Sequence, residues 1–281
     1  MSLTGITAYL RPGTLEEALA LLGEHAIAVG GGTDVIRHPH IGVTTLVDLG
    51  ALPLRYIRQD RGFAVGATAT LTDMLQHPGL AAHLDGVLAQ MLRGVGSPLL
   101  RNAATIGGHL ARGRYSDIVP VLLALDATVT LFEGTERTLA LADYYREGLH
   151  RSPALITEVE LPPAGADNAA AFLKFTRVAY DFALLNCAVR LRLGGDSRPV
   201  ECRIAVGETP ALGSLVTPAA DYLLDGPLDD ERVATAAAIA AHEIAAQDDQ
   251  RASADFRRHL CRVGVRRCLD EARRRLAERR P

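Results

Sequence analysis

The period of the hydrophobic and polar positions predicts short helices alternating with short strands in the first half of the chain. A helix opens at Thr14–Glu17, a capping-box pattern, and a second opens at Thr70. The apolar runs 26–29 and 45–49 predict strands, and 56–67 predicts a hairpin that turns at Asp60-Arg61-Gly62. Further elements expected from the same pattern are helices at 83–93 and 116–125 and a strand at 127–132.

The pattern changes after Leu161-Pro162-Pro163-Ala164-Gly165, where paired prolines end a strand and begin an irregular connection. Beyond this point three apolar segments predict consecutive antiparallel strands, and two long helical stretches follow them. These elements are the strands 171–178, 183–193 and 201–206 and the helices 229–246 and 253–278. Strands followed by helices indicate a separate α+β domain, so we predict two domains, residues 1–165 and 166–281.

Composition narrows the function classes. The chain has 281 residues, of which 48% are hydrophobic, and its net charge of −3 gives no broad basic field that would favour nucleic-acid binding. No apolar run approaches the ~20 residues of a membrane span, and residues 1–11 lack a signal-peptide pattern, so we expect a cytoplasmic protein. The four cysteines form no CxxC pair, which predicts reduced, mostly buried thiols and no metal site.

One residue stands out by its rarity. Lys174 is the only lysine among the 30 lysines and arginines of the chain. Lysine and arginine differ in shape, hydration and the ease with which their pKa is shifted. A single lysine retained in so arginine-rich a chain is therefore a candidate for a role that needs lysine.

Two glycine-rich segments are the main chemical signal. The first is Gly30-Gly31-Gly32-Thr33-Asp34, directly after an apolar strand, and the second is the segment 101–109, which contains Gly107-Gly108. Glycine allows close approach of a ligand to the backbone, and successive amides can form a nest for phosphate oxygens. One such loop could be a plain turn, but two in one domain favour a diphosphate held from both sides, as in a dinucleotide. Neither fits the Rossmann or P-loop spacing, so another fold would hold the ligand.

The residues beyond the second loop leave two interpretations open. The Thr105 hydroxyl can donate a hydrogen bond to phosphate. Ser116 and Asp117 stand at a helix start, where Asp117 can serve simply as an N-cap. Alternatively, its carboxylate accepts hydrogen bonds from a ligand.

Taken in order, these motifs resemble those of a known family. They are Gly-Gly-Thr-Asp near the start, Arg101-Asn102-x-Ala104-Thr105-Ile106-Gly107-Gly108, then Ser116-Asp117 with Pro120, Leu155-Ile156-Thr157 before Leu161-Pro162, and Lys174 followed by Asp181-Phe182-Ala183. The chain resembles, over nearly its whole length, the FAD-binding medium subunit of molybdenum hydroxylases of the xanthine dehydrogenase family. The resemblance implies an α+β fold: a two-lobed, PCMH-type FAD-binding domain, then a C-terminal domain with a three-stranded antiparallel sheet and helices.

The resemblance also implies a set of FAD-binding residues. The loop from Ala28 to Val35 would cradle the pyrophosphate, and Thr105 to His109 would hold it from the other side. Asp117 would contact the flavin or its ribityl chain, and Lys174 would lie near the isoalloxazine, where a cation raises the flavin potential. Val95 and Ile156 would line the cofactor. The implied set is Ala28, Val29, Gly30, Gly31, Gly32, Thr33, Asp34, Val35, Val95, Thr105, Ile106, Gly107, Gly108, His109, Asp117, Ile156 and Lys174.

The function that the resemblance implies is electron transfer. FAD would pass electrons from [2Fe-2S] clusters to an acceptor such as NAD, O2 or a quinone-linked carrier. The implied partners are a small [2Fe-2S] subunit and a large molybdopterin subunit, and no residue of this chain would oxidise the substrate. The alternatives are a stand-alone FAD-dependent oxidoreductase and a flavin-free scaffold subunit.

The sequence departs from the family pattern at three places. His109 replaces the asparagine usual after Thr-Ile-Gly-Gly, and Gly113-Arg114-Tyr115 replaces a small, proline-containing segment. Arg177 follows Lys174 one position earlier than in the common Lys-x-x-x-Arg spacing. His38 and His40, beside the first loop, are expected to be exposed turn residues.

Overall fold

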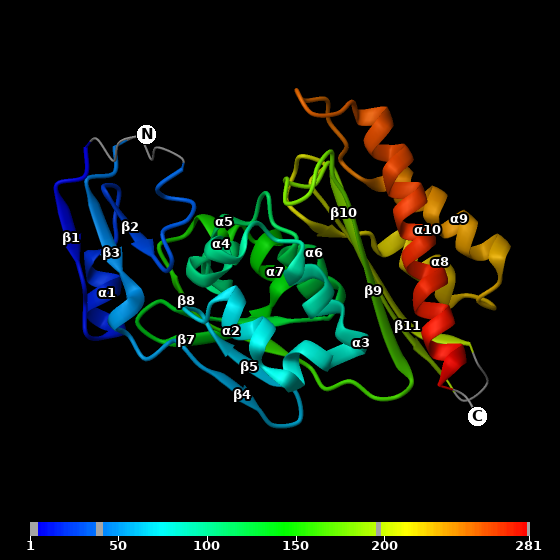
Figure 1. Ribbon diagram of the computed structural model, residues 1–281, viewed down its shortest axis with the longest axis horizontal. Helices are drawn as coiled ribbons and strands as arrows, with labels where there is room; N and C mark the ends of the chain where they lie inside the picture. The colour runs from blue at the N-terminus through cyan, green and yellow to red at the C-terminus, as the bar shows by residue number, and fades with distance from the viewer. Residues whose placement is uncertain (1–4, 38–41, 195–197, 280–281) are drawn as a thin grey trace. The chain divides into compact units, whose positions relative to one another are not determined.

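The computed structural model describes residues 5–37, 42–194 and 198–279, and it confirms an α+β fold (Figure 1). His38 and His40 lie outside the described residues. The chain forms two compact units, each assembled from several segments. Unit 1 comprises residues 1–77, 96–112 and 128–161, and unit 2 comprises 78–95, 113–127 and 162–281. The last crossing between the units falls at Leu161–Pro162, and the predicted division into sequential domains at residue 165 stays a prediction.

Unit 1 contains two sheets. The first is parallel, with the order β1 (Ala8–Leu10), β3 (Thr45–Asp48), β2 (Ala26–Val29), and helix α1 (Leu15–Leu21) lies beside it. As predicted, Thr14 caps α1, because its hydroxyl accepts a hydrogen bond from the Glu17 amide at 3.1 Å. Ala18 of the helix and Val47 of the central strand are fully buried in the core of this lobe.

The second sheet of unit 1 is antiparallel and has the order β4-β5-β8-β6-β7. The predicted hairpin forms its edge, and the predicted helix after Thr70 begins with a complete capping box to Asp73. The strands are β4 (Ile57–Gln59), β5 (Phe63–Gly66), β6 (Thr128–Phe132), β7 (Glu136–Ala140) and β8 (Leu155–Leu161), and the helices of the unit are α2 (Leu71–Gln76), α4 (Pro98–Ala103), α5 (Ile106–Arg112) and α7 (Leu141–Arg146).

Unit 2 is built on an antiparallel sheet of the order β12-β11-β10-β9. The three long strands are the three that the sequence predicts, β9 (Asn168–Phe175), β10 (Leu185–Leu193) and β11 (Pro199–Gly207), and the two-residue β12 (Ser214–Leu215) adds a short edge. Helices α8 (Thr217–Leu224), α9 (Asp230–Glu243) and α10 (Ala254–Glu278) pack on one face of this sheet (Figure 1).

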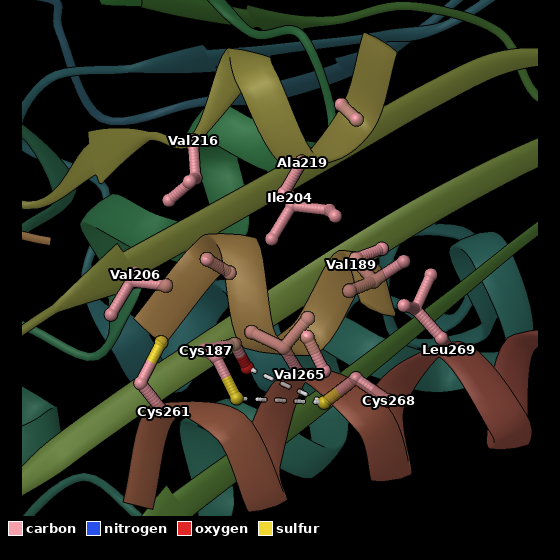
Figure 2. Packing of buried hydrophobic residues seen from close by; sticks show 14 of the residues in the cluster. Cys187, Val189, Ile204, Val206, Val216, Ala219, Cys261, Val265, Cys268 and Leu269 are labelled. Atoms are coloured by element: carbon pink, nitrogen blue, oxygen red, sulfur yellow. Dashed lines mark hydrogen bonds between the residues drawn. The ribbon is translucent and has the colours of Figure 1, made fainter. Parts of the chain in front are cut away.

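Alternation along the strands separates the two faces of this sheet. On the helix-covered face, Cys187 and Val189 of β10 pack against Val265, Cys268 and other residues of α10 (Figure 2). All four cysteines are free and buried, as predicted, and the sulfurs of Cys187 and Cys268 lie 3.8 Å apart. The core of unit 2 is therefore apolar on this side, and polar side chains of the sheet gather on the other.

The opposite face of the sheet is covered by segments that come from the first half of the sequence. Helix α3 (Pro78–Arg93) contacts β9, and helix α6 (Ile118–Ala124) contacts β10 and β11. The amide of Gln90 donates to the carbonyl of Phe172, and the guanidinium of Arg190 donates to the carbonyl of Leu125. These hydrogen bonds hold α3 and the end of α6 against the C-terminal sheet.

Several elements were not predicted from the sequence. The second glycine-rich segment is not an open loop, because Ile106 to Arg112 form helix α5. The predicted helix at 83–93 belongs to α3, which is broken at His83–Gly86, where Leu84, Asp85 and Gly86 adopt positive φ. In the described parts of the chain, no helix combines the length and apolar character that a bilayer crossing requires. Besides α5, the helices and strands that the sequence did not predict are β1, α4, β7, α7, α8 and β12.

Candidate functional site

The first glycine-rich loop begins where the parallel sheet of unit 1 ends. Strand β2 stops at Val29, and the chain turns through Gly30, Gly31 and Gly32, the last with a φ of +69°. A positive φ strains any residue with a Cβ, so the turn itself requires glycine at position 32. The loop is half-buried from Gly30 to Val35, and its backbone therefore remains within reach of a ligand.

The two glycine-rich segments are in direct contact within unit 1. A Cβ on Gly31 would lie 1.6 Å from the carbonyl oxygen of Ala103, and a Cβ on Gly30 would lie 2.5 Å from the Thr105 hydroxyl oxygen. Gly31 is needed for the close approach of the two segments, because its Cβ would meet fixed backbone atoms, whereas at Gly30 the obstacle is the Thr105 side chain, which can turn aside. The sequence predicted two segments acting together, and the structure brings them together.

The segments offer different numbers of hydrogen-bond donors. In the described part of the chain, the amides of Gly31, Gly32 and Thr33 donate to no other residue. By contrast, the amides of Ile106 and Gly107 already donate to the carbonyls of Ala69 and Ala67. The second segment still offers the Thr105 hydroxyl and the Gly108 amide, and that amide makes only a 3.3 Å contact to the Thr105 oxygen.

A charged group adjoins this pair of segments. Arg112, at the end of α5, forms a 3.0 Å ion pair with Asp34 of the first loop. His109 lies on the same helix as Arg112, one turn after Thr105. Desolvation and the positive charge of Arg112 lower the pKa of His109 to about 4, so the imidazole is neutral at pH 7. A neutral imidazole at this position provides one donor and one acceptor and adds no charge.

A second cluster lies in unit 2, around Asp117. The N-cap interpretation of Asp117 is wrong, because its side chain makes no capping bond and Ser116 instead accepts from the Val119 amide at 3.4 Å. One carboxylate oxygen of Asp117 accepts from the Lys174 ammonium at 2.6 Å, and the other accepts from the Asn186 amide at 2.7 Å. Burial raises the pKa of Asp117, and the Lys174 cation and the two hydrogen bonds oppose that rise.

Lys174, the only lysine of the chain, is therefore held at a fixed position. Its ammonium also donates to the carbonyl of Gly94 at 3.1 Å, and 13% of its side chain is exposed. Val95 follows Gly94 in the sequence and is 8% exposed. The Asp117 side chain is 8% exposed, so of this pair Lys174 is the more accessible to a ligand. The structure thus joins three residues of the predicted set, Val95, Asp117 and Lys174, in one cluster.

The remaining apolar residues of the predicted set belong to unit 1. Ile156 lies on β8 opposite Leu131, at a register irregularity of the strand pair, and is 6% exposed. Ala28 and Val29 end β2, and Val35 lies at the end of the first loop. These residues can supply apolar contact surface but no hydrogen bond from their side chains.

Two residues of the second cluster were not predicted. Asn186 is fully buried on β10, and Glu208, just past β11, accepts a hydrogen bond from the Ser116 amide at 2.8 Å. Asn186 interrupts an apolar run from Ala183 to Val189, and this interruption is a signal that the sequence does contain. Glu208 follows Gly207 at a strand end, where a charged residue is ordinary and gives no signal.

The residues present fit an FAD molecule. Among the described residues, the unpartnered amides of Gly31, Gly32 and Thr33 and the Thr105 hydroxyl are suited to a pyrophosphate, and the glycines allow the two segments to lie in contact. A fixed cation in the second cluster is suited to an electron-rich ring. Each cluster has this chemistry within its own unit.

Comparison with known proteins gives the same picture. Residues 4–164 match the family described as "FAD binding domain in molybdopterin dehydrogenase", and residues 170–272 match the "CO dehydrogenase flavoprotein C-terminal domain". The chain is 30% identical over 276 residues to the nicotine 6-hydroxylase medium subunit of Paenarthrobacter nicotinovorans, which covers 94% of this chain and 96% of that protein. It is 27% identical to the carbon monoxide dehydrogenase medium chain of Hydrogenophaga pseudoflava, with the same coverage of both chains.

Solved structures with a similar fold agree. A chain of reconstituted CO dehydrogenase from Oligotropha carboxidovorans superimposes with a TM-score of 0.89 at 26% identity, covering 98% of this chain and all of that one. A chain of quinoline 2-oxidoreductase from Pseudomonas putida 86 superimposes with a TM-score of 0.85 at 25% identity, covering 98% and 99%. The similarity therefore extends over both units of the fold.

Proposed function

We propose that this chain, which belongs to the FAD-binding medium subunits of the molybdenum hydroxylase family, carries electrons from [2Fe-2S] clusters to an external acceptor. FAD is the cofactor of this oxidoreductase subunit. When bound, FAD exchanges electrons singly with iron–sulfur clusters and in pairs with acceptors such as NAD, O2 or a quinone-linked carrier. The partners would be a small [2Fe-2S] subunit and a large molybdopterin subunit, in which the substrate is oxidised.

In this proposal the first cluster binds the pyrophosphate. The amides of Gly31, Gly32 and Thr33 donate to phosphate oxygens from one side, and the Thr105 hydroxyl and the Gly108 amide donate from the other. The Arg112–Asp34 ion pair would lie beside the diphosphate and present the Arg112 guanidinium as its positive end. Hydrogen bonds to a charged acceptor are about twice as strong as neutral ones, so these few donors suffice to fix the diphosphate.

The second cluster would act on the flavin end of the cofactor. Lys174 presents the positive end of an ion pair whose negative end, Asp117, is buried behind it. A cation beside the ring stabilises the negative charge that accumulates on reduction and so raises the reduction potential. Val95 and Ile156 would exclude water from their parts of the binding site, because both present buried apolar side chains.

The observation that supports this proposal is the contact between the two glycine-rich segments, which brings the unpartnered amides of Gly31, Gly32 and Thr33 close to the Thr105 hydroxyl. The test uses the multisubunit complex reduced anaerobically with dithionite and then mixed with NAD, O2 or a quinone analogue. Reoxidation of the clusters is followed by visible absorbance in FAD-replete and FAD-depleted samples. Depletion should slow reoxidation by at least about tenfold, and added FAD should restore the rate.

Two outcomes would contradict the proposal. Equal rates with and without FAD would show that electrons leave the clusters by another route. Substrate turnover by the flavin-loaded chain alone would indicate a stand-alone oxidoreductase instead. As a site-specific check, Lys174→Met should lower the flavin potential, whereas substitution of an exposed arginine on α10, Arg262→Met, should leave it unchanged.

A further inference from the structure

We propose that Asn186 and Glu208 are positioning residues: together they fix the Asp117 carboxylate so that the Lys174 ammonium is held in one orientation toward the cofactor. The inference rests on the proposed function, which places Asp117 and Lys174 at the flavin. It extends the site to two residues on the C-terminal sheet that themselves touch no cofactor in this scheme.

The first step is the geometry of the Asp117 carboxylate. Its two oxygens are held by different donors, Lys174 at 2.6 Å and Asn186 at 2.7 Å, so the carboxylate plane cannot rotate freely. The orientation of the Asn186 amide is defined by this contact, because the flipped amide would place its oxygen against a carboxylate oxygen. Asn186 therefore acts here as a donor only.

The second step concerns the backbone of the same turn. The Ser116 amide donates to the Glu208 carboxylate at 2.8 Å, and the Ser116 carbonyl lies 3.5 Å from the Asn186 amide nitrogen. Glu208 is 6% exposed and has a φ of +61°, a left-handed conformation that is strained for a residue with a Cβ. Strain of this kind persists only where the surrounding contacts require it, and here it places the carboxylate on the Ser116 amide.

The third step is the space around Asn186. A Cβ on Gly207 would lie 2.5 Å from the Asn186 side-chain oxygen, so the neighbouring strand approaches too closely for any side chain. Lys174 and Asn186 are direct partners across β9 and β10, so the sheet register itself places donor and cation on one face. The sheet therefore supplies both groups that donate hydrogen bonds to the Asp117 carboxylate.

The physical reason for such precise support lies in the charges. The Asp117–Lys174 pair is neutral as a whole, so what it offers a ligand is a dipole rather than a net charge. The field of a dipole at a neighbouring group depends on its direction. A small rotation of Asp117 that moves the Lys174 ammonium would change the stabilisation of a reduced flavin more than it would change the stability of the fold.

The test exploits the single lysine. Acylation of the full-length chain by acetic anhydride at fixed pH, with the one lysine-containing peptide quantified by mass spectrometry, reports the reactivity of Lys174 alone. Asn186→Leu keeps the side-chain shape but cannot donate, and Glu208→Ala removes the acceptor. Both should raise the labelling rate at least about threefold, toward that of Asp117→Asn, whereas Glu208→Gln should restore the wild-type rate.

Asn168→Asp is the matched control. Asn168 is 4% exposed, lies on β9 six residues before Lys174 and bonds to Arg190, so its replacement disturbs the same sheet away from the cluster. It should leave the labelling rate unchanged even if the melting temperature falls. Unchanged labelling in Asn186→Leu and Glu208→Ala while Asp117→Asn increases it would overturn the proposal. Unchanged labelling in Asp117→Asn would also overturn it, because the ion pair would then not restrain Lys174.

A second readout connects the positioning to the cofactor. In the FAD-loaded complex, Asn186→Leu should lower the flavin reduction potential, with a tenfold loss of preference for reduced over oxidised FAD corresponding to about 30 mV for a two-electron couple. If Lys174→Met leaves the potential unchanged, the proposed placement at the flavin fails while the labelling result stands. If Lys174→Met lowers it and Asn186→Leu does not, the positioning proposal fails alone.

Discussion

Replacement of Gly31 by alanine tests the first cluster directly. The added Cβ would lie 1.6 Å from the Ala103 carbonyl oxygen and 2.5 Å from its carbon, both backbone atoms that cannot rotate away. To reach even the 3.0 Å that real Cβ contacts respect, the two segments must separate by about 1.4 Å. That displacement exceeds the tolerance of a hydrogen bond, so amides on one segment and the Thr105 hydroxyl on the other could no longer grip one ligand.

The magnitude follows from the bonds that would be lost. A hydrogen bond to a charged acceptor contributes about 1.5–3 kcal/mol, so losing one raises the Kd for FAD about 10- to 150-fold. Gly30→Ala should have a smaller effect, because its Cβ would meet the Thr105 side chain, which can turn aside. Gly23→Ala is the control in the same lobe, since its Cβ would meet no atom within 4 Å.

The assay is titration of the flavin-free chain with FAD, followed by flavin fluorescence, with circular dichroism and a melting curve to establish that each variant is folded. The expected order of affinity is wild type equal to Gly23→Ala, then Gly30→Ala, then Gly31→Ala. A folded Gly31→Ala protein that binds FAD as tightly as wild type would refute the reasoning, because the contact between the segments would then not determine the binding site.

Three further predictions concern the fold. All four cysteines are buried, and burial raises the pKa of Cys202 and Cys261 to about 12. A disulfide reagent at pH 8 should therefore label less than one thiol per native chain but all four thiols in guanidinium. Rapid labelling of the native protein would contradict this prediction. Desolvation and the charge of Arg190 lower the pKa of buried His83 to about 4, so the unfolded chain takes up a proton near pH 6.5 that the folded chain resists, and stability falls as the pH drops from 6.5 to 4. When the pH is lowered from 7.5 to 5.0, the free energy of unfolding in urea should fall by about 2 kcal/mol less in His83→Gln than in wild type. The exposed His242→Gln is the control, and an equal fall in His83→Gln and wild type would refute the assignment. Arg257 is 1% exposed and donates hydrogen bonds to Asp249 and to the carbonyls of Leu184, Gln247 and Ala252. Arg257→Met should therefore destabilise unit 2 by about 3–5 kcal/mol in chemical unfolding. Arg262→Met, on the exposed side of the same helix, should not destabilise it.

The sequence by itself determined the features that depend on local pattern. Alternation and capping predict the strands 26–29 and 45–49, the hairpin at 56–67, the three long strands of the C-terminal sheet and its two long helices. These signals are local because side-chain burial repeats with the period of the element itself. The motifs and their order also resemble those of the molybdenum hydroxylase flavoprotein family, and that resemblance implied the FAD cofactor.

Only the tertiary structure decided how those elements combine. Helices α3 and α6 lie early in the sequence, yet they pack on the C-terminal sheet, and no local pattern records such a long-range contact. Likewise, the sequence left Asp117 open between a helix cap and a ligand group. The structure excluded the cap by showing the carboxylate bonded to Lys174 and Asn186, residues 57 and 69 positions away. A contact between distant residues depends on sheet register and packing, and these are properties of the folded chain rather than of any segment.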